Sequence, residues 1–162
     1  MPDVRFKIVP PVRDAEFLRE AAETLPLVPG SVEDCCSRIR DSTSVTSRDE
    51  AREYLTFLQA LGLVAETELG YHRVREAPDD EALADAFRER VFCAREVVGV
   101  LSDESRSAEA VFEAIREDVP RWERERYEDW EAEWGDRIER LLDWAAVFEL
   151  VTEADGQYRA AQ

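Results

Sequence analysis

The chain is 162 residues long and carries 38 acidic against 21 basic side chains, a formal net charge of -17. This length suits one ordinary domain or two small ones, and 44% hydrophobic residues supply enough apolar material for a core. No apolar run is long enough for a membrane span, and the first residues lack the order of a signal peptide. We therefore expect a cytoplasmic protein. The charge excludes a protein that coats nucleic acid with a wholly basic surface, but it does not exclude a local basic face.

The basic residues are almost all arginine, since 20 are Arg and only Lys7 is Lys. An acidic excess with so little lysine resembles the proteins of organisms that hold molar salt in the cytoplasm, above all the haloarchaea. At molar salt the Debye length shrinks to about 3 Å, so repulsion between surface carboxylates is screened while their hydration keeps the surface soluble. The resemblance implies a halophilic protein whose charge is mainly adaptation to solvent. The alternative is an acidic protein that binds a basic partner.

The cysteines do not form a disulfide framework. Their number is odd, and the neighbours Cys35 and Cys36 point to different sides of any helix, with Cys93 far along the chain. A zinc site would need more ligands than these and His72, the only histidine. We therefore expect buried free thiols and no metal site.

Two segments of the chain recur. Residues 31–41 align with 107–117, with Ser, Glu, Ile and Arg at matching positions, and residues 55–66 align with 142–153. The first pair is offset by 76 residues and the second by 87, so the second copy carries about 11 extra residues. An internal duplication with one insertion explains this pattern. We place copy one at 1–76 and copy two at 77–162.

Both copies predict helices followed by a hairpin. In copy one, apolar periodicity and capping residues predict three helices and two strands: the helices are 14–25, 31–39 capped by Ser31, and one that Thr46 or Ser47 begins and Gly62 ends, and the strands are 64–67 and 71–74. Copy two predicts a helix over about 80–100, a second from Ser107, a third reaching Phe148, and a hairpin turning at Asp155-Gly156. Pro120 could start one long helix running to about Glu149.

This element order resembles the winged helix-turn-helix superfamily. The resemblance covers about 12–75 and 80–160, and it rests on the element order and on the ending FLQALGLVAE…GYHRV, which is widespread in archaeal winged-helix regulators. No specific family is matched. The resemblance implies a mainly α fold with small β-hairpin wings, built as two tandem winged-helix units.

The resemblance also implies a place for DNA. In helix-turn-helix proteins the recognition helix enters the major groove, and in the winged members the wing touches the backbone. Arg48 and Arg52 lie one turn apart, and arginine suits both phosphate and guanine. Carried onto copy one, the DNA-binding candidates are Ser47, Arg48, Arg52, His72, Arg73 and Arg75. The alternative is that Arg48 and Arg52 form ion pairs with the acids of the same helix, Asp49, Glu50 and Glu53.

Copy two does not have the features of a domain that binds the major groove of DNA. Residues 1–75 have a net charge of -3, whereas residues 76–162 have -14, and carboxylates stand where a recognition helix would offer basic groups. Aromatic residues concentrate around the insertion instead. We expect Trp122, Tyr127 and Trp130 to contact a second subunit or a partner, and Ile138, Leu141 and Trp144 to be buried. The alternative is that all of these aromatics fill the core between the copies.

Catalysis is not expected. His72 has no nearby nucleophile or metal partner, and the acids of 123–133 are typical of a solvated helix face. The six glycines do not cluster into a phosphate loop or a dinucleotide fingerprint, so no cofactor is expected.

The sequence thus predicts a DNA-associated transcriptional regulator of a halophile. Copy one would face double-stranded DNA and copy two would provide a dimer or partner contact. The alternative is a protein–protein interaction module, an adaptor or a chromosome-organising subunit, without direct DNA binding.

Overall fold

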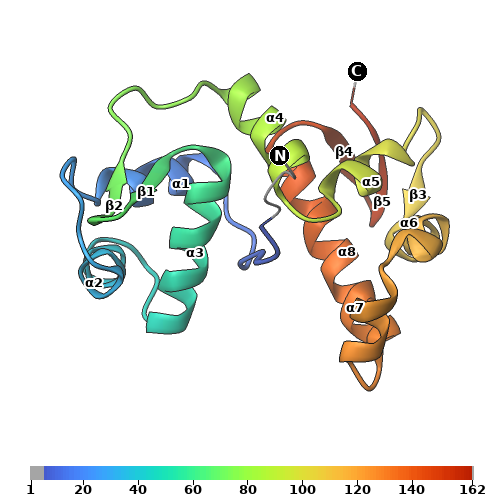
Figure 1. The fold of residues 1–162 in the computed structure, drawn as a ribbon. Coiled ribbons are helices and arrows are strands. Elements are labelled where there is room, and N and C mark those ends of the chain that lie inside the picture. The colour runs from blue at the N-terminus through green and yellow to red at the C-terminus, as the bar shows by residue number, and fades with distance from the viewer. Residues whose placement is uncertain (1–5, 162) are drawn as a thin grey trace. The chain divides into compact units, whose positions relative to one another are not determined.

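The structure, a computed structural model, describes residues 6–161 and is mainly helical, with two small antiparallel sheets (Figure 1). The chain divides into two compact units, Met1–Phe92 (unit 1) and Cys93–Gln162 (unit 2). Each unit holds helices followed by a wing hairpin, which confirms the predicted fold class. The repeat boundary at 76/77 concerns the ancestry of the chain and stays a prediction.

Unit 1 begins its helices where the sequence offers capping side chains. Asp14, Ser31 and Ser47 each accept a hydrogen bond from a backbone N–H in the first turn of the helix that follows. Gly62 ends the third helix with a φ of 85°, a left-handed conformation that favours glycine. The elements are α1 (Ala15–Glu23), α2 (Val32–Ser42), α3 (Arg48–Leu61), β1 (Val64–Thr67), β2 (Gly70–Arg73) and α4 (Asp80–Arg90).

The wing of unit 1 is tied to the segment just before α2. Gly30 and Tyr71 exchange two backbone hydrogen bonds of 2.8 Å, and the N–H of Arg73 donates to the carbonyl of Pro26 over 2.9 Å. Gly70, at the start of β2, has a φ of 133°, and a Cβ built on it would stand 2.3 Å from the carbonyl oxygen of Gly30. Only glycine therefore allows this close approach.

The core of unit 1 lies along α3. The buried apolar residues of α3 occur at spacings of three and four and pack against α2, α4 and β1. Tyr54 places its ring edge-on to Phe17 and donates its hydroxyl to the carbonyl of Pro11 over 2.5 Å, and Phe57 meets Phe87 of α4 edge-on at 6.4 Å. The α4 helix therefore belongs to the core of unit 1.

Unit 2 repeats this arrangement with additional helices. Its sheet has the strand order β3-β5-β4, so the strand before the second helix again pairs with the last strand of the wing. The elements are α5 (Ala94–Gly99), β3 (Arg106–Ser107), α6 (Ala108–Ile115), the 3-10 helix η1 (Arg116–Asp118), α7 (Arg121–Arg126), α8 (Trp130–Val147), β4 (Val151–Ala154) and β5 (Gln157–Ala160).

Residues that align in the sequence have equivalent places in the two units. Ser107 accepts a hydrogen bond from the N–H of Ala110 and caps α6, as Ser31 caps α2. Tyr158 pairs with Arg106 in front of α6, as Tyr71 pairs with Gly30 in front of α2. Asp155 and Gly156 turn the second hairpin with positive φ at both residues, as predicted.

The predicted helix over 80–100 is wrong. The chain leaves the helix after Arg90, because the strand-like segment around Val91 pairs with Phe6: the N–H of Phe6 donates to the carbonyl of Arg90, and the N–H of Phe92 donates to the carbonyl of Phe6. Cys93 then adopts a φ of 69° before α5 begins. Apolar periodicity continues across this interruption, so it gave no warning of the break.

The predicted long helix from Pro120 to Glu149 is also wrong. It is interrupted between α7 and α8, where Tyr127 is extended and Asp129 accepts a hydrogen bond from the N–H of Ala132 to cap α8. The aromatic spacing of three and four runs through both pieces. The capping aspartate was the sequence signal for the break.

All three cysteines are free and buried, as predicted. Burial is the main cause that raises the pKa of each thiol, and it raises the pKa of Cys93 to about 12. None of the helices that the structure describes is long and apolar enough to cross a membrane.

The close approach at Gly70 gives a matched test. We expect Gly156→Ala to cost about 1 kcal/mol, because φ is 77° there but the added methyl meets nothing within 4 Å. Gly70→Ala should cost more than about 2 kcal/mol, since the methyl also disrupts the Gly30–Tyr71 hydrogen bonds. Denaturant unfolding of the two variants in high KCl measures the difference. Equal costs would contradict the close approach.

Candidate nucleic-acid interface

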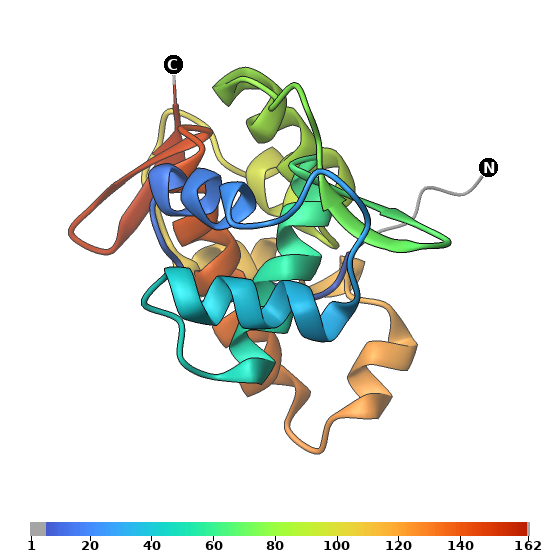
Figure 2. The ribbon, with the colours of Figure 1, turned by 90° about the vertical axis from the view of Figure 1, so that its left-hand side faces the viewer.

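The start of α3 carries three of the predicted contacts, Ser47, Arg48 and Arg52. Figure 2 shows α2 crossing in front of α3. Residues 43–47 form the turn that leads from α2 into α3. Ser47 is exposed, and its hydroxyl accepts the N–H of Glu50 over 3.3 Å. Its hydroxyl hydrogen remains available to an acceptor outside the helix.

Arg48 is held by an acid of the neighbouring helix. Its Nε donates to Oε2 of Glu33 over 3.0 Å, and its Nη2 donates to Oε1 of the same carboxylate, so the contact is bidentate. Asp49 stands 3.9 Å from Nη1. The hydrogen bond from Arg48 is the largest cause that lowers the pKa of Glu33. Arg48 therefore pairs mainly with an acid of α2, but its contact with Asp49 is an ion pair within α3 of the kind that the alternative interpretation predicted.

Arg52 lies one turn after Arg48 and is exposed. Within residues 6–161 its side chain makes no hydrogen bond and no ion pair. Its charge adds to the lowering of the pKa of Glu33, after the larger effect of Arg48. Arg52 is thus the cation of α3 that keeps its donors available for a ligand.

The wing residues form a second group. His72 faces Ala65 in the strand register, and its Nδ1 lies 3.0 Å from the carbonyl oxygen of Arg73. Arg73 and Arg75 line a pocket together with Arg19 of α1. The pocket lies at the base of the wing, where Leu63 connects α3 to β1. The 14 residues of α3 span about 20 Å, so this group lies far from the start of the helix. The structure therefore does not bring the six candidates to one point.

The sequence reasoning missed the arginines that shape these two places. Arg40 donates from Nε to the carbonyl of Thr46 over 3.0 Å, and Arg13 donates to the hydroxyl of Ser44 over 2.7 Å, so both fix the turn between α2 and α3. Arg19 joins the wing arginines although it is more than fifty residues away in sequence. No local pattern marks such a long-range neighbour.

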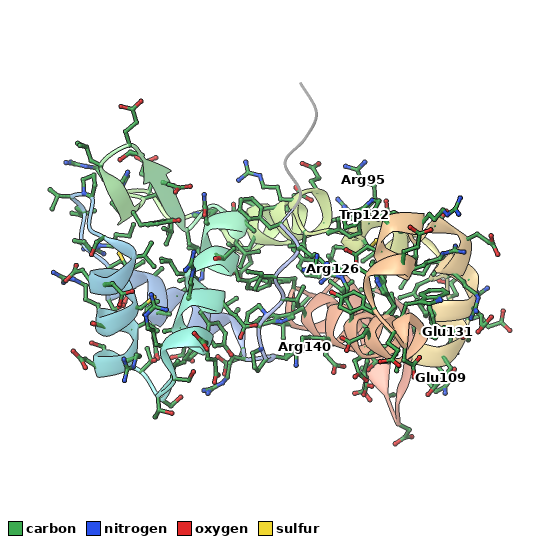
Figure 3. All side chains as sticks on the ribbon, turned by 60° about the horizontal axis from the view of Figure 1, so that its bottom comes forward. Arg95, Glu109, Trp122, Arg126, Glu131 and Arg140 are labelled. Carbon is green, nitrogen blue, oxygen red and sulfur yellow. The ribbon has the colours of Figure 1, made fainter. Side chains whose placement is uncertain are left out.

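The aromatic candidates of unit 2 differ in their exposure. Trp122 on α7 is 55% exposed. The ring of Trp130 contacts the guanidinium groups of Arg116 and Arg124, which lie 5.0 and 5.1 Å from its centre. Tyr127 is half-buried, with Arg126 at 5.6 Å. In the view of Figure 3, Trp122 appears on the same side as Arg95 and Arg126, while Glu109 and Glu131 appear on the other. Trp122 is thus the one of the three with a large exposed apolar surface.

The interior of unit 2 contains a buried acid. Glu123 has no exposed surface, and its Oε2 accepts the indole N–H of Trp134 over 3.1 Å. This bond joins α7 to α8. Ile138, Leu141 and Trp144 of α8 are buried, as predicted. Among residues 6–161 no group of three or more metal-ligating side chains could hold an ion.

The Arg48–Glu33 contact predicts a pH effect. Because Glu33 has a lowered pKa in the folded protein, its contribution to stability is complete above its ordinary pKa and is lost as pH falls through the lowered value. We expect Arg48→Gln to move the pKa of Glu33 up towards its ordinary value. An NMR titration of side-chain carboxyl carbons measures this shift.

Glu131 provides the control for this titration. Its pKa is lowered by a hydrogen bond from Arg116 in unit 2, so it should not respond to Arg48→Gln. If Glu33 titrates identically with and without Arg48, the contact does not exist in solution.

The comparisons with known proteins agree with this fold. A family model described as the halobacterial double winged helix domain matches residues 4–162. No curated protein and no solved structure matches the chain. Because the match covers nearly every residue and the structure holds two units of helices and wings, the chain belongs to the halobacterial double winged helix domain family.

Proposed function

We propose that this protein is a DNA-associated transcriptional regulator whose unit 1 faces double-stranded DNA. The observation that carries the proposal is Arg52, an exposed arginine on the third helix whose guanidinium has no partner within the described residues. In helix-turn-helix proteins the recognition helix places such side chains in the major groove. Arginine there can bind phosphate or the O6 and N7 acceptors of guanine.

The Arg48–Glu33 pair fits this role as an exchangeable contact. The side chains of Arg48 and Glu33 are 41% and 67% exposed, and ion pairs that solvent reaches contribute little to stability. A DNA phosphate can replace the carboxylate of Glu33 and gain the same bidentate geometry with Arg48. Ser47 would then offer its hydroxyl hydrogen beside it, so the start of α3 provides three contacts once Glu33 is displaced.

The distribution of charge within unit 1 also favours DNA binding at the helix-turn-helix and the wing. Residues 1–75, which contain the helix-turn-helix and the wing, have a net charge of -3. Residues 76–92 add six acidic and two basic side chains, so unit 1 reaches -7 and unit 2 has -10. The near-neutral part is therefore the helix-turn-helix and wing alone. Phosphate approaches that part at a lower electrostatic cost than it would approach unit 2.

Unit 2 provides the partner or dimer contact in this proposal. The exposed ring of Trp122 supplies apolar area, and tryptophan is enriched where protein interfaces gain binding energy. Tyr127 lies between α7 and α8 and Trp130 begins α8, and both belong to the same proposed contact. We further infer a halophilic, cytoplasmic protein from the acidic, lysine-poor composition.

A second function has its own supporting observation. Glu33 accepts hydrogen bonds from the guanidinium of Arg48. In a DNA-binding protein, an arginine at this place in the recognition helix would contact DNA instead. With Arg48 neutralised and unit 2 strongly acidic, the protein could act as a protein–protein interaction module without DNA affinity. The two functions differ in whether the arginine side chains of α3 contribute to DNA binding.

Charge reversal at Arg52 separates the two functions. We expect Arg52→Glu to weaken binding to duplex DNA and to reduce the slope of log K against log salt by about 1 or more, because a phosphate contact is replaced by a repelled carboxylate. Fluorescence anisotropy with labelled genomic fragments over a KCl series measures both quantities.

The matched control is Arg121→Glu. Arg121 is exposed on α7 and pairs with Glu125, so it carries the same charge change into unit 2. This variant should bind DNA as the unsubstituted protein does. If the unsubstituted protein retains no fragment across the KCl series, the regulator proposal is rejected and the interaction module is favoured. Equal losses in both variants would assign the binding to net charge and not to α3.

A further inference from the structure

A small pocket opens between α1 and the base of the wing in unit 1. Its volume is about 190 Å³, smaller than the 300 Å³ or more that is typical of sites for drug-sized ligands. Its apolar walls come from α1, from the segment between α3 and β1 and from the chain after β2. These apolar residues are Ala22, Leu63, Val74 and Ala77.

The polar lining of this pocket is mainly cationic. Arg19, Arg73 and Arg75 line it together with a single acid, Glu23. Arg19 is fixed from outside the pocket, because its Nη1 donates to the carbonyl of Pro78 over 3.0 Å and its Nη2 donates to Asp80 over 2.8 Å. The three arginines therefore outnumber the acids even when Asp80, which lies outside the pocket, is counted together with Glu23.

Two of these arginines have unused donors. Within residues 6–161, Arg73 and Arg75 make no side-chain hydrogen bond or ion pair. The Nε of Arg73 is buried without an acceptor, which costs free energy until an acceptor is supplied. A hydrogen-bonded Arg19, a half-buried Arg73 and an exposed Arg75 thus line one small volume with donors to spare.

We infer that this pocket binds one small organic anion, with a carboxylate or phosphate head and a short apolar body. The arginine forks match the oxygen atoms of either head, and the apolar walls suit a body of a few carbon atoms. The volume excludes a nucleotide-sized ligand. This inference goes beyond DNA binding and does not depend on it, because the pocket lies at the end of α3 away from Arg48 and Arg52.

An anion bound in this pocket would also stabilise the wing. Arg73 is part of β2, and its backbone N–H holds the segment before α2 through the carbonyl of Pro26. An anion that fixes the side chain of Arg73 therefore stabilises the strand that carries the wing. Binding should raise the thermal stability of the protein.

Two probes test the inference on the full chain: butyrate, which has a carboxylate head and a short apolar body, and inorganic phosphate, which has a head alone. Each replaces chloride at constant ionic strength, and thermal unfolding and titration calorimetry follow binding. We expect a saturable rise in the unfolding midpoint with each probe. Excluded-solute effects of phosphate appear instead as a rise without saturation, common to every variant.

Three variants decide the outcome. Arg73→Gln should weaken binding of both probes by more than about tenfold, since charged hydrogen bonds are lost. Ala77→Leu, at an exposed position, fills the pocket without removing an arginine and should also reduce binding, so the test stands even if Arg73→Gln fails to fold. Arg88→Gln, which removes a cation of α4 paired with Asp85, should bind both probes unchanged.

The inference is overturned if the full chain gives no saturable response to either probe. It is also overturned if Arg73→Gln responds as the unsubstituted protein does. If neither probe binds while Arg73→Gln weakens binding of duplex DNA, the arginines contact a DNA backbone phosphate, and the small-anion site does not exist.

Discussion

The structure depends on one backbone pairing that occurs in both units. The residues just before the second helix pair with the last wing strand, through Gly30 and Tyr71 in unit 1 and through Arg106 and Tyr158 in unit 2. This pairing fixes the wing against the helix-turn-helix, because a strand cannot shift by one residue without reversing its side chains. In unit 1 the contact is so close that Gly70 must be glycine. The positions of the wing arginines follow from it.

Local signals in the sequence were enough to predict most of the fold. Capping side chains such as Ser31 and Ser47, the left-handed Gly62 and the Asp155-Gly156 turn act over a few residues, and each was found where the pattern placed it. The two helices predicted too long failed for a different reason. Pairing of Phe6 with the segment around Val91, and the cap at Asp129, interrupt apolar patterns that are continuous in sequence.

The candidate site was harder to predict because it depends on contacts between distant residues. Arg48 was expected to face DNA or to pair within its own helix. It does contact Asp49 of α3, but its bidentate partner Glu33 lies on α2, which periodicity alone could not reveal. Arg73 and Arg75 gather with Arg19 of α1 and not with the start of α3. Unit 1 therefore separates its cations into two places: an exposed one at the start of α3, suited to a polyanion, and an enclosed one at the base of the wing, suited to a small anion.

The two units share a fold but present different surfaces, and the central claim is that unit 1 alone meets DNA. Amide NMR of the full chain, titrated with a duplex fragment in high KCl, tests this most directly. We expect chemical-shift changes to begin at the first turns of α3, around Ser47 and Arg52, with α8 and the β4–β5 hairpin of unit 2 unchanged. Changes confined to unit 2, or no changes at all, would contradict the account.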